Sequence, residues 1–109
     1  MLRVIVESPY AGSVARNVEY ARRCMRDSLD RGEAPILSHL LYTQVLDDGI
    51  TADRKKGIEA GLAWSEVAHL AAVYTDHGTS LGMEKAIKVH RANGTPIAYR
   101  KLGIEGRMK

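Results

Sequence analysis

Residues 73–85, Val-Tyr-Thr-Asp-His-Gly-Thr-Ser-Leu-Gly-Met-Glu-Lys, decide the fold, and they follow the largely apolar run of residues 69–72. The run and residues 73–75 are typical of a buried strand, the acidic, glycine-rich centre is typical of a turn, and residues 86–90 continue with helical spacing. Glu84 therefore falls in the first turns of a helix, beyond the carboxyl end of a strand. Ligands of open α/β sheets bind at that edge. A carboxylate near a helix N-terminus is held ionised and can act as a nucleophile.

Spacing alone leaves two explanations of Glu84 open. Acidic residues are common in the first turn of helices because the helix dipole favours them, so Glu84 needs no catalytic role. A capping box does not explain it, because the position three residues after the candidate cap Ser80 is Met83 rather than Glu or Gln. The spacing is therefore compatible with a dipole-stabilised acid or with a reactive carboxylate at a ligand site.

On both sides of residues 73–85, predicted strands alternate with predicted helices along the chain. Alternating elements of this kind favour a parallel sheet covered by helices on both faces. We expect an α/β fold, a small flavodoxin-like three-layer sandwich whose four-stranded parallel sheet has the order 2-1-3-4. The expected strands are residues 2–6, 35–38, 69–75 and 96–100, and the expected helices are 13–30, 51–66 and 80–92, with residues 40–48 left as a short helix plus a loop.

Helical spacing also predicts which side chains are buried. The expected buried positions are Val14, Val18, Ala21, Met25 and Leu29 in the first helix, Ile58 and Leu62 in the second, and Met83, Ala86, Ile87 and His90 in the third. Trp64 is expected in the core, and Cys24, the only cysteine, is expected to be a buried, inert thiol.

Separate segments of the chain resemble one known family. Residues 81–84, Leu-Gly-Met-Glu, look like the stretch that holds the nucleophilic glutamate in the nucleoside 2-deoxyribosyltransferase family, which includes transferases and deoxynucleotide N-glycoside hydrolases. Residues 4–12, Val-Ile-Val-Glu-Ser-Pro-Tyr-Ala-Gly, are similar to the family's first strand and the loop after it, and Pro96-Ile97 marks where its last strand begins. The resemblance runs in order from residue 2 to about 100 and extends to short, often phage-associated members of that superfamily. It implies a single domain over residues 1–109, with a peripheral tail from about residue 103.

The resemblance implies N-glycosidic chemistry, hydrolysis or base transfer, on a nucleoside or nucleotide-like ligand. Glu84 would attack the anomeric carbon of the sugar, a second acid would protonate the departing base, and water or another base would resolve the ester. Asp76 or Asp53 is the candidate acid. Tyr10 would stack on the base or form a hydrogen bond near Glu84. The implied catalytic set is therefore Glu84, Asp76 and Tyr10.

Polar and aromatic residues follow each of the first three strands, and the carboxyl ends of parallel strands meet at one sheet edge. We expect one ligand cleft there. Ser8, Thr79 and Ser80, with the backbone N–H groups at the helix start, could hold hydroxyls or a 5′-phosphate. Tyr10 could instead pack against the sheet, Thr79 or Ser80 could be only the helix cap, and Asp76 could only order its turn. The expected ligand-binding residues are Glu7, Ser8, Tyr10, Gly12, His39, His77, Gly78, Thr79, Ser80 and Gly82.

The chain also departs from the family pattern. Many members carry an acid in a stretch resembling Asp-Leu-x-Trp before the third strand, whereas residues 61–64 here read Gly-Leu-Ala-Trp. A position that is often polar in the family is Gly78. These differences leave base protonation and phosphate recognition open, so a non-catalytic nucleotide-binding or interaction module is the alternative function.

The composition and net charge indicate the general class of this protein. A chain of 109 residues with 45% hydrophobic and 27% charged residues is an ordinary single globular domain, and its net charge of +3 is spread in short runs that do not point to nucleic-acid binding. No metal site or cofactor is expected, because no His pair has ligand spacing and no phosphate-binding glycine motif occurs.

The absence of a long apolar run and of a signal-peptide layout predicts a cytoplasmic protein without membrane contact. We expect a homodimer or larger homo-oligomer, with Tyr42, Val45, Leu46 and Ile50 as candidate contacts.

Overall fold

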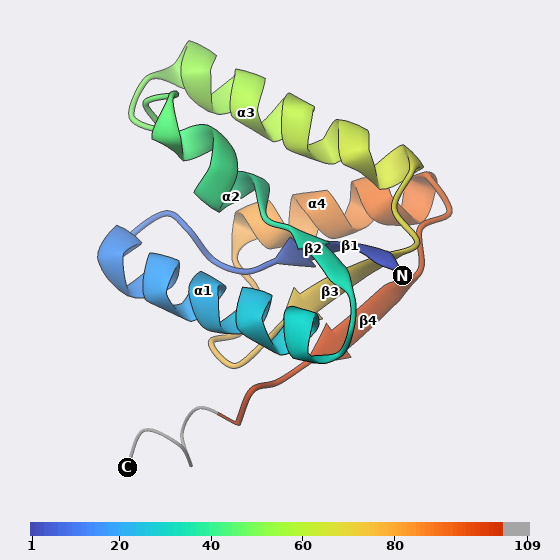
Figure 1. The fold of residues 1–109 in the computed structure, drawn as a ribbon. Helices are drawn as coiled ribbons and strands as arrows, with labels where there is room; N and C mark the ends of the chain where they lie inside the picture. Colours follow the sequence, from blue (N-terminus) through green and yellow to red (C-terminus); the bar gives the residue numbers. More distant parts are fainter. Residues whose placement is uncertain (104–109) are drawn as a thin grey trace.

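The computed structural model describes residues 1–103, so the predicted peripheral tail lies almost entirely outside the described residues. Its centre is a parallel sheet of four strands in the order β2-β1-β3-β4, which confirms the predicted topology (Figure 1). The strands are β1 (Arg3–Glu7), β2 (Ala34–Ile36), β3 (Leu70–Tyr74) and β4 (Ile97–Arg100).

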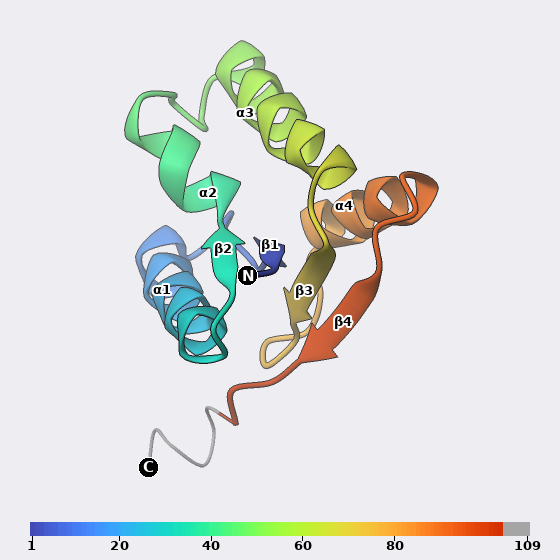
Figure 2. The ribbon, with the colours of Figure 1, turned by 45° about the vertical axis from the view of Figure 1, so that its right-hand side comes forward.

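Helices cover both faces of this sheet. Helix α1 (Val14–Asp30) lies on one face and α4 (Leu81–Ala92) on the other (Figure 2). The predicted short helix after β2 is α2 (Ser38–Leu41), which continues into the 3-10 turn η1 (Tyr42–Gln44). Helix α3 (Thr51–Ala63) ends in a second turn, η2 (Trp64–Glu66), and packs against α2 and α4 rather than on the sheet. No helix within residues 1–103 is long and apolar enough to cross a membrane.

Alternation along the strands divides the core between the two faces. Val4 and Val6 of β1 pack in one cluster with Tyr20 and Cys24 of α1, while Val73 of β3 packs with α4. Neighbouring residues of parallel strands that pair in register point to the same face. Glu7 pairs with Val73, so the carboxylate at the end of β1 lies on the α4 face.

Helical spacing predicted burial for some apolar residues that are partly exposed in the structure. Val14, Leu29, Ile58 and Trp64 are each between 41% and 51% exposed, which corrects their predicted burial. The stripe of α1 that meets the sheet is instead Tyr20, Ala21, Cys24 and Ser28, and α3 has no sheet to cover. The Trp64 indole N–H donates to the Tyr42 hydroxyl, which satisfies its polar atom at the surface. The predicted stripe of α4 and the buried Cys24 are confirmed.

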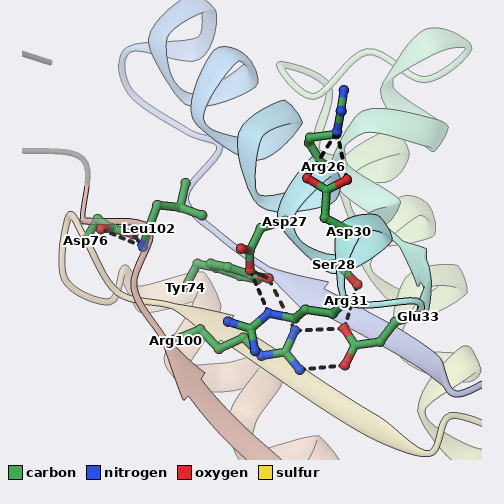
Figure 3. Close-up of polar contacts among 10 residues, drawn as sticks. All are labelled: Arg26, Asp27, Ser28, Asp30, Arg31, Glu33, Tyr74, Asp76, Arg100 and Leu102. Atoms are coloured by element: carbon green, nitrogen blue, oxygen red, sulfur yellow. Dashed lines mark hydrogen bonds and ion pairs between the residues drawn. The ribbon is translucent and has the colours of Figure 1, made fainter. Parts of the chain in front are cut away.

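A buried polar network closes the α1 face (Figure 3). The Arg100 guanidinium donates to both carboxylate oxygens of Glu33, at 2.8 and 2.7 Å, and Ser28 Oγ donates to the same carboxylate. Arg100 also donates to the Tyr74 hydroxyl, which donates to Asp27. The hydrogen bonds from Arg100 outweigh burial and lower the pKa of Glu33. This network fixes β4 to the turn after α1.

Candidate functional site

A cavity of about 400 Å³ opens at the carboxyl edge of the sheet. Its floor is the end of β1, and its walls are the segment after β2, helix α3 and the N-terminus of α4. Of the predicted site residues, those that line it are Glu7, Ser8, Tyr10, His39, Ser80 and Gly82, together with the alternative acid Asp53. The cleft expected at this edge is therefore present, and segments that follow β1, β2 and β3 contribute to it.

His39, Ser8 and Tyr10 form a connected group on one side of the cavity. His39 is the second residue of α2, and its Nε2 lies 2.7 Å from Ser8 Oγ. The Tyr10 ring meets the His39 ring edge-on, with centroids 6.2 Å apart. Burial lowers the pKa of His39, although the Glu7 charge opposes this. His39 is thus neutral near pH 7 and can accept the Ser8 hydroxyl proton.

One oxygen of the Glu7 carboxylate is in contact with a buried histidine. His90, on the inner stripe of α4, is fully buried, and its Nε2 lies 2.8 Å from Glu7 Oε2. Its Nδ1 lies 2.8 Å from the hydroxyl of Ser65 in η2. Ser65 is paired in turn with Thr95, whose hydroxyl donates to the Ser65 carbonyl. One side of the Glu7 carboxylate is therefore fixed by a chain of buried groups.

Glu84 lies apart from this cavity. Its carboxylate accepts a hydrogen bond from the Thr79 hydroxyl. The residues that line the cavity on α4 are Leu81, Gly82, Met83, Lys85 and Ala86. Successive residues of an α-helix are about 100° apart, so Glu84 projects from another face. Thr79 and His77 line a second, smaller hollow, which adjoins the cavity at Ser80. Within residues 1–103, Glu84 lines neither space.

Ser80 is the helix cap that the sequence allowed. Its side chain accepts a hydrogen bond from the backbone N–H of Met83 at 3.2 Å, and its own N–H lies 3.4 Å from Met83 Sδ. The methionine thus occupies the place of the acid in a capping box. Ser80 combines this structural role with a place on the cavity wall.

Asp76 orders its turn, as the second explanation of that residue predicted. Its carboxylate accepts hydrogen bonds from the backbone N–H groups of Leu102 and Gly103 and from the Tyr20 hydroxyl. Burial, and then this bond to Asp76, raises the pKa of Tyr20. Asp76 does not border the cavity in the described part of the chain, so its predicted acid role has no support from geometry.

Two of the three predicted binding glycines shape loops rather than the cavity wall. Gly12 and Gly78 have φ angles of 93° and 76°, in the region that favours glycine. Neither residue lines the cavity or the second hollow among the described residues. Their positive φ angles explain why glycine occupies these turns.

The residues that sequence reasoning missed come mainly from α3 and the segment before it. Asp48 lines the cavity from that segment, Arg54 and Gly57 line it from α3, and Lys85 lines it from α4. Arg54 forms an ion pair with Asp48 at 3.6 Å, and Asp53 accepts a hydrogen bond from the Asp47 N–H. The spacing of Asp53, Arg54 and Gly57 at the start of a helix was a usable signal, but it does not reveal which face α3 turns toward the sheet edge.

The absence of an acid at position 61 has a steric cause. A Cβ atom on Gly61 would lie 2.5 Å from Ser38 Oγ and 2.6 Å from Ser38 Cβ. These distances are shorter than real Cβ contacts, so α2 and α3 meet too closely here for any side chain. The acid expected from the resemblance could not occupy this position without moving α2.

Residues 2–100 match the family described as a domain of unknown function, DUF7768. The chain belongs to this family. The DUF7768 chain is also similar to a solved 2-deoxyribosyltransferase from the psychrotolerant bacterium Bacillus psychrosaccharolyticus, described as a biocatalyst for the synthesis of antiviral and antitumoral nucleosides. The sequence identity is 15% and the TM-score 0.65, and the match covers 91% of this chain and 72% of the other. At this identity the similarity shows a shared fold. No curated protein matches the DUF7768 chain.

Proposed function

We propose that the cavity binds a nucleoside-like molecule and that the protein breaks or transfers its N-glycosidic bond. The observation that carries the proposal is the meeting of a fixed carboxylate, Glu7, an aromatic ring, Tyr10, and a neutral imidazole, His39, in one cavity at the ligand edge of the sheet. The fold shared with a deoxyribosyltransferase supports this choice of substrate.

The size and chemistry of the cavity fit such a ligand. Its volume of about 400 Å³ falls within the range of roughly 300–1,000 Å³ that is typical of small-molecule sites. Leu46, Ile58 and Leu62 give an apolar wall for a flat base, while Asp48 and Asp53 offer acceptors for sugar hydroxyls or exocyclic amines. Apolar walls with a few polar groups are the usual composition of such sites.

The role of Glu84 as nucleophile stays a prediction from the resemblance. A ligand confined to the cavity does not contact the Glu84 carboxylate. That carboxylate is hydrogen-bonded to Thr79 and lies on another face of α4. A ligand that extends over Ser80 into the second hollow would come beside Thr79. The prediction therefore requires a substrate that occupies both spaces.

The test is incubation with a panel of ribo- and deoxyribonucleosides and their 5′-phosphates, with free base separated by chromatography. Release of base from at least one member, dependent on enzyme concentration, is the expected result. Addition of a second, labelled base distinguishes hydrolysis from transfer, because only transfer yields a labelled nucleoside.

A binding module without turnover is the second candidate. It is favoured by the position of Glu84 outside the cavity and by the steric exclusion of an acid at Gly61. Calorimetric binding of a nucleoside that is recovered intact after prolonged incubation would select this function over the first.

We also propose that the chain forms a homo-oligomer. Of the predicted contacts, Val45 and Ile50 are 84% and 51% exposed, while Tyr42 and Leu46 line the cavity. Exposed apolar side chains of this kind are found at contacts between copies. Light scattering at micromolar concentration tests this, and a mass near that of the 12.0 kDa chain would contradict it.

A further inference from the structure

We propose that Glu7 is the catalytic carboxylate of this cavity and acts as a general base toward water, while His90 and Ser65 position it. The proposal rests on the function proposed above and names the residue that performs it. It differs from the mechanism that the resemblance implies, in which Glu84 attacks the sugar directly.

The first argument is the position of Glu7. It is the last residue of β1 and pairs in register with Val73, so it lies at the carboxyl edge on the face covered by α4. The cavity is open on that face, and Glu7 is one of its lining residues. Its side chain keeps 17% of its surface exposed, whereas its partner His90 is completely buried. A rigid strand thus presents the carboxylate to the ligand space.

The second argument is that the two carboxylate oxygens have different surroundings. Oε2 is 2.8 Å from His90 Nε2. Oε1 makes no hydrogen bond to any group in residues 1–103. An oxygen that already accepts a hydrogen bond is the poorer site for a proton, so a proton taken up by Glu7 goes to Oε1. The exchangeable proton is thereby directed to the oxygen without a protein partner.

The third argument is the tautomer of His90. An ionised carboxylate only accepts hydrogen bonds, so the proton between His90 Nε2 and Glu7 Oε2, which are 2.8 Å apart, is on Nε2 and points at Glu7. In the neutral imidazole, Nδ1 then accepts from the Ser65 hydroxyl, 2.8 Å away. Ser65 is itself fixed by Thr95, whose hydroxyl donates to the Ser65 carbonyl at 2.8 Å.

The fourth argument is that the other acidic groups are less suited to the role. Asp48 is paired with Arg54, and Asp53 accepts the Asp47 N–H at the start of α3. Asp76 is occupied by Leu102 and Gly103 on the α1 face, and Glu84 lies outside the cavity. Glu7 alone among these combines a place in the cavity with a fixed orientation from a buried partner.

The reaction balances with water as the only co-reactant. Glu7 Oε1 takes a proton from a water molecule while the water oxygen bonds to the anomeric carbon. The bond between that carbon and the base nitrogen breaks, and its electron pair goes to the nitrogen. Glu7 then gives its proton to the departing base, which leaves a free sugar, a free base and the ionised carboxylate.

The test compares Glu7→Gln, Glu84→Gln and Glu59→Gln on a nucleoside that the parent protein hydrolyses. Glu59, an exposed residue of α3, is the matched control and should equal the parent. Glu7→Gln should lower kcat by about 10²–10⁴-fold, the usual contribution of a general base, with little change in KM. Glu84→Gln should stay within a few-fold of the parent, and no labelled base should enter nucleoside.

The positioning role of His90 has its own readout. His90→Leu should lower kcat at constant KM, and His90→Gln should recover part of the loss because its amide N–H can still donate to Glu7. Equal losses in the two variants would overturn this role. Melting temperatures control for folding, and Glu7→Asp, which keeps the charge but withdraws it, should fall between the parent and Glu7→Gln.

The outcomes separate this inference from the proposed function. Base release by Glu7→Gln at the parental rate overturns the inference and leaves the function intact. Loss of release in Glu84→Gln together with label exchange overturns it in favour of the ester mechanism. No release by the parent from any nucleoside overturns both.

Discussion

Two glutamates, Glu33 and Glu7, show how differently the two faces of the sheet treat a carboxylate. Both side chains are nearly buried, with 11% and 17% of their surface exposed. Glu33, on the α1 side, receives two hydrogen bonds from the Arg100 guanidinium and one from Ser28. Glu7, on the α4 side, has only His90 as a hydrogen-bond partner within residues 1–103.

The difference in hydrogen-bond partners distinguishes a carboxylate that stabilises the fold from one that is able to react. A carboxylate whose oxygens are all occupied by a cation and hydroxyls has no capacity left for a ligand. A carboxylate fixed at one oxygen and open at the other is oriented without being saturated. The network around Glu33 therefore maintains the fold, and the arrangement around Glu7 suits a reaction.

The largest expected effect on stability comes from Arg100→Met. The change leaves Glu33 nearly buried without its cation, and breaking a buried ion pair by removing one partner costs about 3–5 kcal/mol. Because both side chains retain some exposure, we expect the lower end of that range. Denaturant unfolding measures the loss, and a change below about 1 kcal/mol would show that the network adds little.

The same substitution at the two glutamates tests the comparison directly. Glu33→Gln should cost roughly 1–3 kcal/mol because the amide cannot accept two bonds from the guanidinium. Glu7→Gln should cost less than about 1 kcal/mol, since its amide oxygen can still accept from His90. The measurement is the unfolding free energy of both variants and of the parent protein. Equal losses of stability in the two variants would contradict the proposed difference between the two faces.

A third prediction concerns the contact between α2 and α3. Gly61→Ala should destabilise the protein by about 1–3 kcal/mol, because the new methyl group overlaps Ser38. Ser38→Gly removes the atoms that the methyl group meets, so the double variant should recover most of the loss. A double-mutant cycle from melting curves measures this, and additive losses would contradict the close contact.

The smallest expected effect is a pH dependence from His39. Burial lowers the folded-state pKa of this group below its usual value near 6.5, so the unfolded chain binds more protons as the pH falls. Stability should therefore be full above about pH 7 and should decline as the pH falls through about 6.5. His39→Gln should flatten this part of the profile. The lowered pKa values of Glu33 and Asp27 act at more acidic pH, because carboxyl groups titrate there.

The sequence was sufficient for the sheet because its signals are local. Apolar runs, glycine-rich turns and helical periodicity predicted every strand within two residues and the order of all four. Periodicity was less reliable for burial: Ile58 has the spacing of a core residue, but α3 packs over the cavity, where that stripe stays half exposed. Local spacing does not specify what a helix packs against.

The site was predictable in part for the same reason. Residues that directly follow strands, such as Ser8 and Tyr10, were placed at the correct edge by topology alone. The partnership of Glu7 with His90 spans 83 positions and depends on α4 crossing the end of β1. Strand alternation and the buried stripe of α4 together could have suggested it. The choice between Glu7 and Glu84 required knowing which face of α4 borders the cavity.

The contact between Ser38 and Gly61 has a consequence for the history of the family. Two positions that share one small space cannot change independently, so related sequences should show them varying as a pair. A relative with an acid at the position of Gly61 should carry glycine at the position of Ser38, or a shift of α2 that reopens the gap. Gaining that acid thus requires two substitutions, and chains with serine and glycine at these positions are separated from it by an unfavourable intermediate.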